Sequence, residues 1–119
     1  MAEPEGAAID VARLDALRRL IGDDEFRRLA DKFLADLSQR IDTMERLGAA
    51  GDVTTIGREA HTLRGTAGSY GLQSVASLAE RLEAACTAAP GEVAERLRAL
   101  NAGMAASIAR MVAEFGLKA

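Results

Sequence analysis

Hydrophobic residues recur at steps of three and four along most of this chain, and that period is typical of amphipathic helices. The pattern predicts a short helix from about Asp10 to Ile21 and a long second helix that ends in LGAAGD, residues 47–52. Asp52 is a suitable N-cap for a third helix, and Gly71 ends that helix. No stretch alternates polar and apolar residues, so the sequence predicts no strands.

Two further helices complete the pattern. The fourth is expected from about Leu72 to Ala88, and the fifth begins at Pro90, which suits the first helical position. Each expected helix has one apolar face. From the first helix to the fifth, these faces consist of Leu14, Leu17 and Ile21; Phe26, Leu29, Phe33, Leu37, Ile41, Met44 and Leu47; Val53, Ile56, Ala60, Leu63, Ala67 and Tyr70; Leu72, Val75, Leu78, Leu82 and Cys86; and Val93, Leu97, Leu100, Met104, Ile108, Met111 and Phe115. Four long amphipathic helices with short loops, and a small N-terminal helix beside them, predict an all-α antiparallel four-helix bundle. We expect one domain over residues 1–119, with residues 1–9 as a flexible lead.

Composition narrows the possible functions. The 119 residues are 49% hydrophobic and 28% charged, which suits one soluble domain. A net charge of −3 without basic runs argues against a nucleic-acid partner. The N-terminus does not have the pattern of a signal peptide and no stretch is apolar enough to span a membrane, so we expect a cytoplasmic protein. Cys86 is the only cysteine; we expect it to be a small buried helix residue, with no metal-ligand cluster.

His61 is the only histidine of the chain, and it lies off the apolar face of the third helix. At about 100° per residue, that face is centred roughly 130° from the histidine. Its helical neighbours on the same side are Gly57, Arg58, Arg64, Gly65 and Gly68. A glycine inside a helix costs roughly 1 kcal/mol relative to alanine, so these glycines require a reason other than stability.

An imidazole beside bare backbone and cations suits nucleophilic attack on phosphorus. A neutral imidazole is a nucleophile near physiological pH, and a large phosphoryl donor must approach it in line. Glycines one turn away would admit such a donor, and a guanidinium would balance the phosphoryl charge. Two other interpretations stay open: His61 as an ordinary surface residue, and the glycines as signs of a close helix crossing.

The stretch AHTLRGTAGSYGL, Ala60 to Leu72, resembles the signature of histidine-containing phosphotransfer (HPt) domains of bacterial two-component phosphorelays. That signature reads A-H-x-L-K-G, followed by small residues and a further glycine. Arg64 stands where the family usually has lysine. The positive charge is kept, but the forked guanidinium differs in geometry from the lysine ammonium. The resemblance extends to LDALRRLIGDDEFRRLADKFLADL (Leu14 to Leu37), to the pair Gly51-Asp52 and to LAERLE (Leu78 to Glu83).

The resemblance implies that His61 accepts a phosphoryl group from the aspartyl phosphate of one receiver domain and passes it to another. Arg64 would assist the phosphoryl charge, and Glu83 on the next helix would hydrogen-bond the imidazole. The face that docks the partner would include Gly57, Arg58, Gly65 and Gly68.

The receiver domain would bring Mg²⁺ and most of the catalytic machinery. The chain is therefore expected to hold no cofactor of its own, to have no kinase activity and to work as a monomer. The alternative is a non-catalytic helical module that binds a receiver or another signalling partner.

Overall fold

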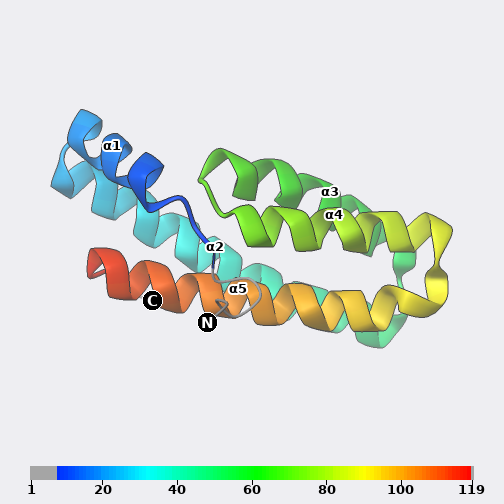
Figure 1. Ribbon diagram of the computed structural model, residues 1–119. Coiled ribbons are helices and arrows are strands. Elements are labelled where there is room, and N and C mark those ends of the chain that lie inside the picture. Colours follow the sequence, from blue (N-terminus) through cyan, green and yellow to red (C-terminus); the bar gives the residue numbers. More distant parts are fainter. Residues whose placement is uncertain (1–7, 119) are drawn as a thin grey trace.

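The computed structural model describes residues 8–118 and folds them into helices joined by short turns (Figure 1). The helices are α1 (Val11–Ile21), α2 (Asp23–Ala50), α3 (Val53–Ser69), α4 (Gln73–Ala88) and α5 (Val93–Phe115), with a short 3₁₀ helix, η1 (Pro90–Glu92), before α5. Residues 8–118 contain no strand, and the predicted all-α class is confirmed. No helix in this range has the length and hydrophobicity needed to cross a membrane.

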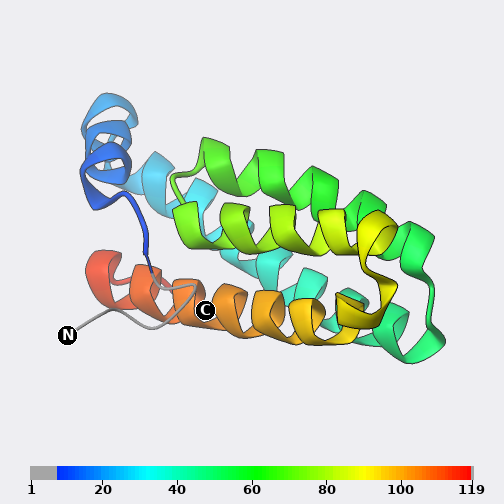
Figure 2. The same ribbon diagram turned by 45° about the vertical axis from the view of Figure 1, so that its right-hand side comes forward.

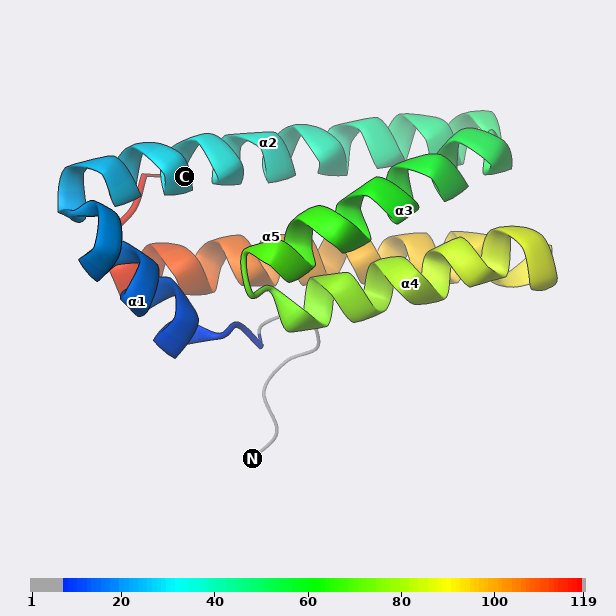
Figure 3. The same ribbon diagram turned by 90° about the horizontal axis from the view of Figure 1, so that it is seen from above.

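The four long helices α2 to α5 run in alternating directions and form the bundle (Figures 2 and 3). The hairpin of α3 and α4 packs on the longer pair α2 and α5, while α1 lies across one end. Each bundle helix contributes a leucine with no exposed surface to the core: Leu37, Leu63, Leu82 and Leu100. Burying such a side chain contributes roughly 1.5–3 kcal/mol. The packing of these four leucines therefore helps to fix the positions of α3 and α4 relative to each other.

Two aspartates cap helices, as the sequence predicts for Asp52. The carboxylate of Asp52 accepts a hydrogen bond from the backbone N–H of Thr55 at 3.2 Å, at the start of α3. The carboxylate of Asp10 accepts from the N–H of Arg13 at 3.0 Å, at the start of α1. Gly51 ends α2 in the left-handed conformation, with φ of 68°, which glycine adopts without strain.

The turn between α3 and α4 is joined to the N-terminal segment. Gly71 has φ of +74°, and its carbonyl accepts a hydrogen bond from the N–H of Asp10 at 2.8 Å. A Cβ atom at Gly71 would lie only 3.1 Å from Cβ of Asp10, so both the conformation and the space favour glycine. Beside this turn, Tyr70 stacks on Phe33 with ring centroids 4.2 Å apart.

Several sequence predictions need correction. Pro90 begins a 3₁₀ turn, and α5 itself begins at Val93. Leu29 is 37% exposed, while Leu34, absent from the predicted face, is 1% exposed. The buried residues of α2 centre near Leu37 in angle, and Leu29 lies roughly 80° away on the helical wheel. The predicted lead falls mainly in residues 1–7, which lie outside the described part, but Ile9 belongs to the core.

Candidate functional site

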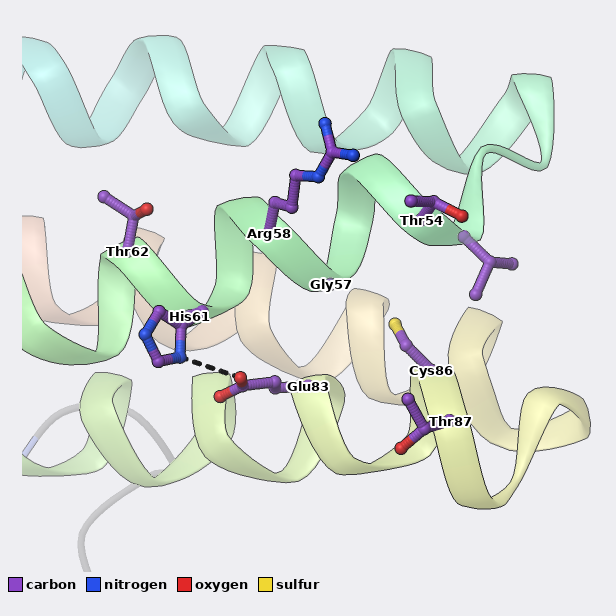
Figure 4. Close-up of a pocket in the computed structure, with 9 residues that line it drawn as sticks. Thr54, Gly57, Arg58, His61, Thr62, Glu83, Cys86 and Thr87 are labelled. Atoms are coloured by element: carbon purple, nitrogen blue, oxygen red, sulfur yellow. Dashed lines mark hydrogen bonds and ion pairs between the residues drawn. The ribbon is translucent and has the colours of Figure 1, made fainter.

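His61 projects from α3 toward α4, where it meets Glu83 (Figure 4). The ring nitrogen Nδ1 lies 2.8 Å from Oε2 of Glu83, and the histidine side chain is 62% exposed. A carboxylate can only accept a hydrogen bond, so Nδ1 carries the hydrogen and donates it. In the neutral ring the lone pair is then on Nε2, which is the nitrogen available for chemistry.

Glu83 also links the histidine to a cation. Its second oxygen, Oε1, lies 3.5 Å from Nη1 of Arg64, an ion pair that does not reach hydrogen-bond geometry. Oε1 is buried and has no hydrogen-bond partner among the described residues. One carboxylate is therefore shared by the imidazole and the guanidinium, and it brings together the three residues that the sequence analysis singled out for chemistry.

A groove of about 620 Å³ runs between α3 and α4 beside the imidazole. Its walls are Val53, Thr54, Gly57, Arg58, His61, Thr62, Glu83, Cys86 and Thr87 (Figure 4). His61 stands at one end of this set and the first turn of α3 at the other. The imidazole therefore borders an open groove of the α3–α4 hairpin.

The glycines around His61 fall into two groups. A Cβ atom at Gly65 or Gly68 would have no neighbouring atom within 4 Å, so both positions are open backbone. A Cβ atom at Gly57 would lie 3.5 Å from Cβ of Cys86, in ordinary contact across the α3–α4 interface. Gly57 therefore lies at the contact between the two helices, and the open surface beside His61 comes from Gly65 and Gly68.

Arg58 is placed differently from Arg64. Its side chain extends toward α2, away from the imidazole (Figure 4). Hydrogen bonds from the Thr55 hydroxyl and backbone hold the pKa of Asp52 below its usual range, and the charge of Arg58 adds a smaller effect. The structure thus brings one of the two predicted flanking cations, Arg64, to the carboxylate that orients the ring.

Cys86 packs against the core, as the sequence analysis expected of a small helix residue, and it also lines the groove, which that analysis did not foresee. It is half-buried and lines the groove, one turn after Glu83 on the same face of α4. Burial raises the pKa of the Cys86 thiol, and the nearby charge of Glu83 raises it further. The three-residue spacing from Glu83 is the sequence signal that could have placed Cys86 near His61.

These features define a class of protein: an all-α bundle with one exposed histidine that a carboxylate on the next helix orients. The family model of the Hpt domain matches residues 28–114, which include His61, Arg64 and Glu83. The chain belongs to the Hpt domain family, whose members act in histidine phosphotransfer of two-component phosphorelays and interact with receiver domains. The resemblance seen in the sequence is confirmed. Neither a curated protein nor a solved structure matches the chain significantly.

Proposed function

We propose that this chain accepts a phosphoryl group on Nε2 of His61 from the aspartyl phosphate of a receiver domain and relays it to a second receiver domain. The observation that carries the proposal is the 2.8 Å contact between Nδ1 of His61 and Oε2 of Glu83. It holds one nitrogen of an exposed ring and directs the lone pair to the other.

The transfer conserves protons at the histidine. Nε2 attacks phosphorus, the N–P bond forms, and the bond between phosphorus and the aspartyl oxygen breaks. The leaving aspartate takes the electron pair and becomes a carboxylate. The hydrogen on Nδ1 stays in place, so the phosphorylated ring is an imidazolium whose charge Glu83 balances. The reverse sequence passes the group to the next aspartate.

Arg64 supplies positive charge on the histidine side of this reaction. Its guanidinium is held near His61 by the shared carboxylate of Glu83, and its side chain is 41% exposed. A guanidinium can bind two phosphoryl oxygens in parallel. Movement of Arg64 from Glu83 toward the phosphoryl group would therefore stabilise the phosphorylated state, while the receiver domain provides Mg²⁺.

Phosphotransfer from a purified, phosphorylated receiver domain tests the proposal directly. His61→Gln removes the nucleophile and is expected to abolish acid-labile phosphorylation of the chain. Glu83→Gln removes the charge that orients the ring and is expected to slow transfer by about tenfold or more. Glu80→Gln, a change of the same kind at an exposed position of α4, is the matched control. Transfer that persists in His61→Gln contradicts the proposal and favours a non-catalytic binding module.

Two further points belong to the same proposal. We propose that the chain works as a monomer, because its histidine, its orienting carboxylate and its cation all come from one copy, and we place it in the cytoplasm with the receiver domains that it would serve. Light scattering of the purified protein during gel filtration measures its mass. A stable dimer whose dissociation changes the transfer rate would contradict the monomeric mechanism.

A further inference from the structure

The helix α1 lies outside residues 28–114, the part that the Hpt family model matches, yet it is fixed to the helix that carries His61. Two backbone hydrogen bonds join the segment before α1 to the α3–α4 turn: Asp10 N–H to the Gly71 carbonyl at 2.8 Å, and Ser74 N–H to the Ala8 carbonyl at 3.4 Å. Figure 3 shows α1 beside this turn. α1 therefore has a fixed position at the end of α3.

Arg13 is the residue of α1 that reaches α3. Its guanidinium Nη1 donates to the carbonyl of Gly68 at 3.4 Å, which uses one of its five N–H groups. Gly68 follows His61 by seven residues, or about two turns, so it lies on the same face about 10 Å further along the axis. Cβ atoms at Gly65 and Gly68 would meet no atom within 4 Å, so the backbone is open at both positions between His61 and the end of α3 that Arg13 reaches.

The other α1 arginines are neutralised within their own helix or at its end. Arg18 and Arg19 both form ion pairs with Asp15, and Arg18 also approaches Asp23. No ion pair joins Arg13 to a carboxylate within residues 8–118, and the nearby carboxylate of Asp10 accepts the backbone N–H of Arg13 as the helix cap. Arg13 is thus the α1 cation that reaches the Gly68 end of the open surface, and it forms no ion pair in the part of the chain that the structure describes.

A partner that docks over His61 is large enough to reach Arg13. A stable protein–protein interface covers about 800 Å² on each side, which corresponds to a disc with a radius of about 16 Å. Arg13 is too far from His61 to contact the phosphoryl group being transferred. If Arg13 pairs with the docked partner, it must therefore pair with a different group of that partner. A carboxylate fits best, because it balances the charge and matches the guanidinium fork.

On these grounds, and resting on the proposed phosphotransfer, we infer that α1 extends the docking surface and that Arg13 pairs with a carboxylate at the rim of the docked receiver domain. The contact lies beside the reacting atoms and does not take part in the bond exchange. Arg13 accordingly sets how fast and how selectively receivers dock, and the chemistry at His61 proceeds without it.

Arg13→Ala and Arg13→Glu test this inference in the full chain, with the receiver domain that phosphorylates the wild type fastest among a purified panel. The matched control is Arg19→Ala, which removes the same charge from α1 at a position 79% exposed and paired with Asp15. We expect Arg13→Ala to lower kcat/KM for transfer about three- to tenfold, and Arg13→Glu more. Added salt should reduce both losses, and Arg19→Ala should stay within about twofold of wild type.

Phosphoramidate, a small phosphoryl donor, separates docking from chemistry. It should phosphorylate His61 equally in the wild type and in all three arginine variants, because it makes no contact with α1. Equal effects of Arg13→Ala and Arg19→Ala on receiver transfer would overturn the role of Arg13 and leave the proposed phosphotransfer intact. A wild-type chain that accepts phosphate from no receiver domain in the panel would overturn the proposed function itself.

Discussion

Replacement of Gly65 by leucine separates the stability of α3 from the access that its glycine provides. Gly65 has ordinary helical backbone, and a Cβ atom there would meet no atom within 4 Å. Side chains on a helix lean toward its N-terminus and cover the preceding turn. A leucine at this position would therefore lie over His61, which is four residues earlier.

Gly65→Leu is expected to raise the stability of the chain and to lower the rate of phosphotransfer. Glycine to alanine in an exposed helix stabilises by about 1 kcal/mol, and leucine has nearly the same propensity as alanine. With the typical unfolding entropy per residue, this corresponds to a rise in Tm of about 4 °C for a chain of 119 residues. Transfer should fall about 100-fold, because the added side chain displaces the docked donor by more than the roughly 1 Å that in-line attack tolerates.

Thermal unfolding followed by circular dichroism measures the change in Tm, and receiver-dependent phosphorylation measures the change in transfer rate. Gly65→Ala is the control, since it gives the same stabilisation with only one additional carbon atom. A leucine variant that transfers as fast as wild type would refute the reasoning, because docking would then not need the bare backbone. A variant that is less stable than wild type would show that the position is packed.

Three further predictions follow from the site and the caps. Glu83→Ala removes the acceptor of the Nδ1 hydrogen, so ¹⁵N NMR of the neutral ring should show the Nδ1–H tautomer in the wild type and a shift toward Nε2–H in the variant. The lowered pKa of Asp52 means that its contribution to stability is present above about pH 4, the usual value for an unfolded aspartate, and disappears as the pH falls through the folded value. Urea unfolding across that range should therefore show a smaller acid loss in Asp52→Asn than in the wild type. The raised pKa of Cys86 keeps its thiol protonated near neutrality, and mass spectrometry should show slower alkylation by iodoacetamide than for free cysteine, with the rate increasing at alkaline pH.

Local rules were sufficient to predict most helix boundaries. Asp52 and Gly51 mark the junction of α2 and α3 through a side-chain cap and a left-handed backbone, and both signals are visible in the sequence. The face of α2 was harder to predict, because a stripe read from consecutive three- and four-residue steps drifts around a long helix. For this reason Leu34 is buried and Leu29 is exposed, the reverse of the prediction. Where the apolar face of a helix is broad, the helices that pack on it decide which of its two sides is buried.

The site was predictable in part. Periodicity placed His61 off the apolar face, and the structure confirms its exposure. The pairing with Glu83 was implied only by the family resemblance, since a contact across 22 residues depends on the register that the α3–α4 turn imposes. Periodicity could not show that Arg58 turns toward α2 while Arg64 stays near the imidazole, because both lie three residues from His61. Side-chain direction at that spacing is set by neighbouring helices.

The low helix propensity of the His61 face is possible because α3 obtains its stability from the opposite face. Its inward residues, Ile56, Ala60, Leu63 and Ala67, are at most 1% exposed. Tertiary packing of this kind outweighs intrinsic propensity in most protein helices, so an outward glycine weakens α3 without unfolding it. This division between a buried and an exposed face explains why Gly65→Leu is expected to stabilise α3 and still impair function. The helix is already held by its buried face, and a large side chain added outside would occupy space that the proposed docking partner needs.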